Sequence, residues 1–276
     1  MEESKIQDIE ISLFLDALLQ RHGYDFGNYA KASIKRRVLG LASAQCQSVA
    51  ELIPRLLHEE DYLAEVISQL SVPVSAMFRD PPVFKTLRET VLPLLKTYPR
   101  INVWQAGCAT GEEVFSLVIM LEEEGLLERT QIYATDINDI VLHKAEDGIF
   151  PMRNLAEYER NYKSAGGKAM FSDYYIANDE FFRIHEHLRQ KIVFAHHNLV
   201  SDGVFCEVQL ILCRNVLIYF NDELQKRVLN LFHKSLVRNG FLCLGTRESL
   251  RAVEAQHIFT VHNQECMIFH NQGILS

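Results

Sequence analysis

The chain has 276 residues, 48% of them hydrophobic, and a formal net charge of -8 at pH 7, which predicts one or two globular domains with a buried core. It contains neither an apolar run long enough to cross a bilayer nor a signal peptide at residues 1–5, so we expect a cytoplasmic protein. The acidic charge argues against nucleic-acid binding, and six cysteines without a CxxC pair argue against a metal site or a disulfide framework.

Residues 1–72 predict a small N-terminal domain made only of helices. Gly23 ends the first helix, and Ser48 with Glu51 forms a capping box at the start of the third. Apolar residues at helical spacing predict four helices, over residues 11–22, 30–41, 49–56 and 62–70.

The second of these helices is basic, because it carries Lys35, Arg36 and Arg37. Such a run is commonly a solvated helix face. It could equally be a basic surface for an acidic partner, and the sequence leaves both interpretations open.

Residues 73–100 predict a linker followed by a helix that leads into the next domain. Asp80 is expected to cap this helix, because Pro81 and Pro82 follow at the early helical positions that proline favours.

Residues 101–276 alternate strands with helices, which predicts an α/β fold with a doubly wound, mostly parallel sheet. A segment over about 153–190 interrupts the alternation, and we expect it to form an inserted subdomain of short antiparallel strands, one of them over 181–185. Strands of the main sheet are expected over residues 101–105, 132–135, 192–195, 208–212, 241–244 and 267–270, and helices over 114–121, 140–145 and 223–237.

A glycine turn between the first strand and the next helix predicts a ligand site. Ala106 and Gly107 begin the turn, and Gly111 ends it. Glycine lets the backbone approach a ligand closely, and the start of a helix presents unpaired N–H groups. Glu112 and Glu113 at the helix start would repel a phosphate but tolerate a cationic ligand.

Two further polar groups follow apolar strands. Asp136 ends the second strand, where a carboxylate could accept hydrogen bonds from ribose hydroxyls or cap the next helix; we favour ribose. Arg214, Asn215 and Tyr219 cluster after the strand at 208–212, where they could line a site or a surface loop. The G-x-G-x-x-G pattern is absent, which argues against NAD.

These motifs together resemble the CheR-type chemotaxis receptor methyltransferases. Residues 107–116, Gly-Cys-Ala-Thr-Gly-Glu-Glu-Val-Phe-Ser, are similar to that family's Gly-Cys-x-Thr-Gly-Glu-Glu-x-[Tyr/Phe]-Ser signature. Residues 134–137, 198–199 and 213–220 also match the family in order and spacing, and residues 77–80, ahead of the signature, resemble a further family segment. The resemblance implies a class I, Rossmann-like methyltransferase fold. It also implies methyl transfer from S-adenosyl-L-methionine to glutamate side chains of methyl-accepting chemoreceptors, leaving S-adenosyl-L-homocysteine.

The resemblance also implies roles for individual residues. Arg79 and Tyr219 would lie near the transferring methyl group, as catalytic residues, and the basic Lys35, Arg36 and Arg37 would meet the acidic receptor helix. The cofactor would contact Ser75, Arg79, Ala106, Gly107, Glu112, Glu113, Asp136, Asn198, Leu199, Arg214 and Asn215.

The chain departs from the family pattern at two places. Pro73-Val74-Ser75 stands where the family shows Asn-x-[Thr/Ser], so an amide side chain is missing. The inserted segment lacks the Gly-x-Gly turn of members that bind a receptor's C-terminal pentapeptide, so we expect no such tether. Two alternatives remain, a cofactor-binding regulator and a methyltransferase for another carboxylate. The receptor, its glutamates, the pathway and the oligomeric state are not specified.

Overall fold

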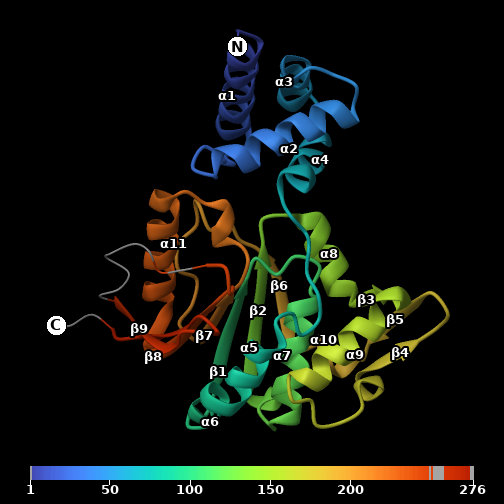
Figure 1. Ribbon diagram of the computed structural model, residues 1–276, viewed down its shortest axis with the longest axis vertical. Coiled ribbons are helices and arrows are strands. Elements are labelled where there is room, and N and C mark those ends of the chain that lie inside the picture. Colours follow the sequence, from blue (N-terminus) through green and yellow to red (C-terminus); the bar gives the residue numbers. More distant parts are fainter. Residues whose placement is uncertain (1, 249, 251–257, 274–276) are drawn as a thin grey trace.

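Four N-terminal helices lie beyond the carboxyl ends of the parallel strands of a seven-stranded sheet in the computed structural model, which describes residues 2–248, 250 and 258–273 (Figure 1). The capping box is present, because Ser48 N donates to Glu51 Oε2 at 2.7 Å and Glu51 N donates to Ser48 Oγ at 3.4 Å. Ile11, Phe14 and Leu18 face a separate apolar core of this helical layer. The four predicted helices are α1 (Glu2–His22), α2 (Lys31–Ala44), α3 (Val49–His58) and α4 (Tyr62–Leu70).

The segment that follows differs from its prediction at Asp80. Asp80 precedes α5 (Pro81–Thr86), but its backbone is left-handed (φ 55°) and its side chain caps nothing. The carboxylate instead pairs with Arg214, 134 residues along the chain, so Asp80 holds the predicted cap position through its backbone alone, with the prolines following as predicted. A π-helix, η1 (Leu87–Val91), and α6 (Leu92–Leu95) complete the segment.

The main sheet has the predicted fold, mostly parallel and wound on both sides. Five strands run parallel, in the order β6 (Ile192–His196), β2 (Thr130–Asp136), β1 (Ile101–Ala106), β7 (Val208–Cys213) and β8 (Leu236–Leu244). Two antiparallel strands, β10 (Ile268–Asn271) and β9 (Phe259–Asn263), extend it beyond β8. The sequence analysis missed β9, and it extended the helix before β8 by two residues.

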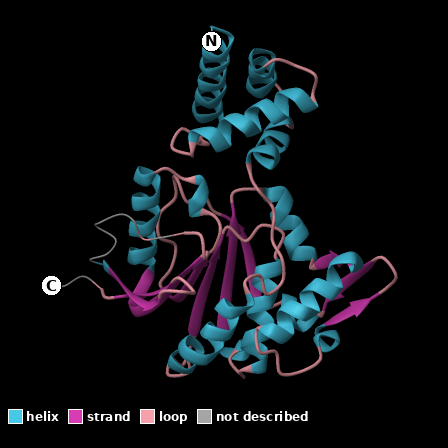
Figure 2. Ribbon diagram, in the orientation of Figure 1, coloured by secondary structure: helices cyan, strands magenta, loops and turns pink. Residues whose placement is uncertain are grey.

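Helices cover both faces of this sheet (Figure 2). Val103 and Leu210 point to the face covered by α7 (Glu112–Glu123), whereas Trp104 and Ile211 point to the face covered by α11 (Asp222–Ser235). Both β1 and β7 are buried along almost their whole length, as expected for strands with helices on both faces of the sheet. The remaining helices beside the sheet are η2 (Leu127–Arg129), α8 (Asp139–Asp147) and η5 (Leu217–Tyr219).

The inserted segment forms a second, antiparallel sheet of three short strands, as predicted. Its order is β3-β5-β4, and it begins before residue 153 because β3 already pairs with β5 at Ile149. Phe150 and Phe182 pack together beneath it at a ring distance of 5.5 Å. Its elements are β3 (Ile149–Pro151), η3 (Met152–Asn154), α9 (Leu155–Ser164), η4 (Phe171–Tyr174), β4 (Tyr175–Ala177), β5 (Phe181–Ile184) and α10 (Glu186–Arg189).

The helical layer is joined to the sheet by backbone and side-chain hydrogen bonds. Ala30 N donates to Tyr219 O at 2.7 Å, and Asn221 N donates to Asn28 O at 2.9 Å. A further hydrogen bond joins the end of α4 to the start of α8, because Asn138 Nδ2 donates to Ser71 Oγ at 2.8 Å. These contacts hold α2 over the ends of the parallel strands. Within the described residues, no helix is both long and apolar enough to span a membrane.

Candidate functional site

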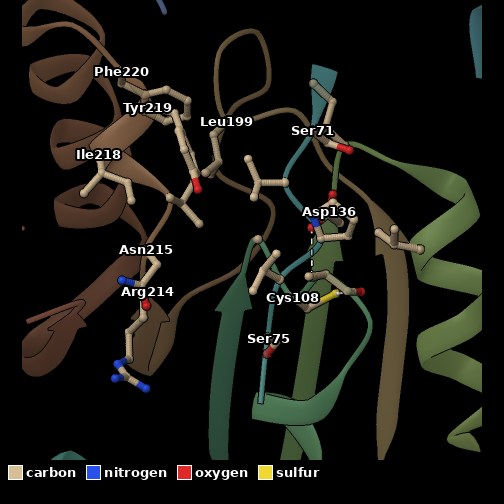
Figure 3. A pocket seen from close by; sticks show the side chains of 18 of the residues that line it. Ser71, Ser75, Cys108, Asp136, Leu199, Arg214, Asn215, Ile218, Tyr219 and Phe220 are labelled. Carbon is tan, nitrogen blue, oxygen red and sulfur yellow. Dashed lines mark hydrogen bonds between the residues drawn. The ribbon is translucent and has the colours of Figure 1, made fainter. Parts of the chain in front are cut away.

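A cavity of about 390 Å³ lies between the helical layer and the carboxyl ends of the parallel strands. This volume is in the range of small-molecule sites, and the carboxyl edge of a parallel sheet is where such folds bind ligands. Figure 3 shows Asp136, Cys108 and Ser75 on one side and Arg214, Asn215 and Tyr219 on the other. The helical layer contributes Phe26, Tyr29 and Arg37 to the lining.

The glycine turn brings bare backbone to the cavity wall. Gly107 has a left-handed backbone (φ 71°), and a Cβ on it would lie 2.5 Å from Val216 Cγ2. Gly111 is also left-handed (φ 91°), and its Cβ would lie 2.9 Å from Ala145 Cβ. Both positions therefore require glycine on two grounds, conformation and space.

Glu113 and Arg214 form a buried ion pair at the cavity. Arg214 Nη1 donates to Glu113 Oε2 and to Arg79 O, and Arg214 Nη2 donates to Asp80 Oδ2 at 2.6 Å. Burial lowers the pKa of Arg214, but the carboxylates of Glu113 and Asp80 outweigh it, so the net shift is upward. Arg214 thus stays charged and ties the start of α7 to the loop that carries Arg79.

Glu112 and Glu113 have different surroundings, although the sequence analysis grouped them. Glu113 lines the cavity, whereas Glu112 is absent from its wall and accepts a hydrogen bond from Thr110 Oγ1 at 2.6 Å. Burial raises the pKa of Glu112. Ala106 also lies outside the lining, buried in the core next to α11.

Asp136 is held by backbone donors at the end of β2. Its carboxylate accepts from Ala109 N at 2.9 Å and from Asn138 N at 3.0 Å. Burial raises its pKa. The helix-cap alternative is excluded, because the cap of α8 is Asn138, whose side chain accepts from Ile140 N. Asp136 is therefore available to the cavity that it lines.

Asn198 and Leu199 line the cavity after β6. The Asn198 side chain accepts from Val200 N at 2.9 Å, and Asn198 N donates to Asp202 Oδ2 at 2.8 Å, so this turn is rigidly built. Leu199 adds an apolar wall that is 8% exposed. An apolar wall beside an amide suits a planar heterocycle.

Arg79 and Tyr219 reach the cavity from different segments. Phe78, buried against Phe84 and Tyr162, has a left-handed backbone (φ 51°), and its N–H donates to Ser116 Oγ at 2.7 Å. This anchor places the half-buried Arg79 beside the cavity. Tyr219 is half-buried on the other side, and its hydroxyl points inward (Figure 3).

The three basic residues of α2 have three different environments. Arg37 lines the cavity, donates to Ser71 O at 2.8 Å, and lies 5.1 Å from the centre of the Tyr219 ring. Lys35 pairs with Asp8 of α1 at 2.6 Å, and Arg36 is exposed.

Two further residues predicted for the cofactor site, Ser75 and Asn215, also line the cavity.

The sequence analysis missed two buried groups at the site. Glu248 accepts from the backbone N–H groups of Gly245, Asn215 and Ile218, and burial raises its pKa. It orders the loop that leads to Tyr219, and because it lies 33 residues beyond Asn215, no local motif pointed to it. Gln105 is 1% exposed, lines the cavity and donates from Nε2 to Glu113 Oε1 at 2.9 Å.

A nucleoside with a cationic amino-acid end fits this chemistry. Asp136 can accept hydrogen bonds from ribose hydroxyls, Leu199 offers an apolar wall, and the acidic Glu113 lies across the cavity beside the glycine turn. A seven-stranded sheet with these groups at its carboxyl ends has the chemistry that an S-adenosylmethionine-dependent methyltransferase needs.

Comparison with known proteins gives the family. Residues 73–267 match the model for the CheR methyltransferase, SAM binding domain, and residues 9–71 match that for the CheR methyltransferase, all-alpha domain. The chain belongs to the CheR methyltransferase family. It is 50% identical to the putative methyltransferase Cher3 of Pseudomonas putida, over 91% of this chain and 92% of that one. It is 31% identical to a chemotaxis protein methyltransferase of Listeria innocua, over 94% and 97%.

Proposed function

We propose that this protein methylates glutamate side chains of chemoreceptors in the cytoplasm, producing methyl esters and S-adenosylhomocysteine. The observation that carries the proposal is the composition of the cavity wall. Although the chain is acidic, the cavity wall carries Arg79, and it carries Arg37 close to Tyr219, together with Glu113 and Asp136. Cationic groups at one part of the wall suit an incoming carboxylate, and acidic groups at another suit a cationic cofactor.

For the cofactor, we propose contacts from the residues that line the cavity. Glu113 and the turn at Gly107 would hold the methionine end, Asp136 the ribose, and Asn198 with Leu199 the adenine. Ser75, Arg214 and Asn215 would complete the wall. Ala106 and Glu112 would act from behind it, since neither lines the cavity. When bound, S-adenosylmethionine supplies an electrophilic methyl group on a sulfonium ion.

The protein's own task would be positioning. A glutamate carboxylate is ionised near neutral pH, so no side chain has to remove a proton. Arg79 would orient the carboxylate, and Tyr219 would donate a hydrogen bond to its second oxygen. The helical layer would exclude water, which strengthens these contacts. Arg79 is held through Arg214, which donates to its carbonyl oxygen at 3.1 Å.

For the receptor, we propose that residues 1–72 form the docking domain and that residues 101–276, together with Ser75 and Arg79 of the preceding segment, carry the transfer chemistry. Arg36 and Lys35 on α2 would face an acidic receptor helix, and Arg37 would mark the way into the cavity. The turn between β4 and β5 reads Asn178-Asp179-Glu180 and has no glycine. We therefore propose that docking needs no C-terminal pentapeptide. Titration with such a peptide should show no saturable binding, and micromolar affinity would overturn this part.

A transfer assay tests the proposed reaction. The full chain is incubated with methyl-labelled S-adenosylmethionine and receptor cytoplasmic fragments, and label is followed before and after mild base. Base-labile label on a receptor fragment is the expected result. Arg79→Ala should lose most of it, and Arg160→Ala, an exposed arginine of α9 outside the cavity, should lose none. Base-stable label, or cofactor binding without transfer to any receptor, would contradict the proposal.

A further inference from the structure

Gln105 ends in a buried oxygen without a partner. Its Oε1 atom has no hydrogen-bond partner, although the side chain is 1% exposed. A buried acceptor left unpaired costs about 1–3 kcal/mol, so such an atom in a native site calls for a ligand or a bound water. Gln105 lines the cavity from the carboxyl end of β1, shortly before the glycine turn.

The neighbouring carboxylate determines which way the Gln105 amide faces. Glu113 Oε1 can only accept when ionised, so the amide must present its NH2 group there, at 2.9 Å. Glu113 Oε2 is occupied by Arg214. The amide oxygen is therefore turned away from Glu113 and held as a free acceptor.

We propose that Gln105 Oε1 accepts a hydrogen bond from the α-ammonium group of the bound cofactor, directly or through one water. This inference rests on the proposed placement of the cofactor's methionine end beside Glu113. An ammonium group is a donor only, so it satisfies an orphaned acceptor and is attracted by the carboxylate next to it. Gln105 thus determines selectivity for a ligand that carries the amino group.

Residue 73, where the chain departs from the family pattern, provides no amide to the cavity. Pro73 lines the cavity but has neither an amide side chain nor a backbone N–H. Gln105 supplies an amide to the same cavity from the sheet.

A binding cycle with two ligands tests the role of Gln105. Calorimetry compares S-adenosylhomocysteine with its analogue in which hydrogen replaces the α-amino group. Gln105→Leu should weaken S-adenosylhomocysteine by about tenfold to a hundredfold, the range for a hydrogen bond to a charged group, and leave the analogue's affinity unchanged. A purely structural role would weaken both ligands equally, and that result overturns the proposal.

Two controls keep the test decisive. Gln131→Leu removes a half-buried glutamine of β2 outside the cavity and should change neither affinity. If Gln105→Leu does not fold, Gln105→Asn shortens the amide by one methylene and should show the same selective loss. Failure of the wild-type protein to bind S-adenosylhomocysteine would instead overturn the cofactor placement itself, and this inference with it.

Discussion

Arg214→Met should destabilise the sheet domain far more than the loss of an ordinary surface ion pair. The Arg214 side chain is 0% exposed, and its partner Glu113 is 8% exposed, so the substitution leaves a buried carboxylate without its counter-charge. Breaking a buried pair in this way costs about 3–5 kcal/mol. The second partner, Asp80, is 37% exposed, and a pair screened by solvent contributes about 0–1 kcal/mol.

The only tryptophan of the chain provides the assay. Trp104 is fully buried in β1, so its fluorescence reports unfolding of the sheet domain rather than of the helical layer. Urea titrations would compare Arg214→Met with Asp80→Asn, which should cost less than about 1 kcal/mol. Adding Glu113→Gln to Arg214→Met removes the stranded charge and should recover at least half of the loss.

If Arg214→Met lowered the free energy of unfolding by less than about 1 kcal/mol, this reasoning would be refuted, because the buried pair would then contribute no more than an exposed ion pair. Failure of Glu113→Gln to rescue would show that the loss comes from packing rather than from the buried charge.

Three further predictions concern the cavity wall. Gly107→Ala should weaken S-adenosylhomocysteine binding and destabilise the domain by about 2–4 kcal/mol, because the left-handed backbone disfavours alanine and its Cβ would overlap Val216. Adding Val216→Ala should recover only the part of this free-energy loss that comes from the overlap. Because burial raises the pKa of Asp136, its carboxylate takes up a proton at a higher pH than an ordinary aspartate and then offers fewer acceptor sites, so S-adenosylhomocysteine affinity should drop as the pH falls through that raised pKa. Asp136→Asn should flatten this pH profile, and an unchanged profile would remove Asp136 as its source. Tyr219→Phe should leave S-adenosylhomocysteine affinity unchanged and lower kcat by about tenfold, which is the effect of losing one hydrogen bond to a charged group. If only the affinity changed, Tyr219 would contact the cofactor rather than the glutamate.

The sequence was sufficient to predict groups that directly follow apolar strands. Asp136 and Arg214 could be placed at one sheet edge, because parallel strands bring their carboxyl ends together. The glycine turn could be predicted for the same reason. These inferences need only local patterns and one rule of topology.

Other features depend on rotation and on long-range pairing, which local patterns do not encode. Consecutive helix residues point about 100° apart, so only one of Glu112 and Glu113 could face the cavity, and the sequence did not tell which. The basic residues of α2 point in different directions for the same reason, so Lys35 pairs with Asp8 whereas Arg37 donates to Ser71 O. The pairing of Asp80 with Arg214 joins residues 134 positions apart, and it takes the Asp80 carboxylate away from the start of α5.

Mapping the modified residue on a receptor fragment tests the central claim most directly. After incubation with S-adenosylmethionine, tandem mass spectrometry would locate the methyl groups, with the Arg79→Ala protein as the control. The account predicts methyl esters on glutamate side chains of the receptor's helical cytoplasmic region, absent with the control protein. Methyl groups on other residue types, or on glutamates to the same extent with Arg79→Ala, would contradict it.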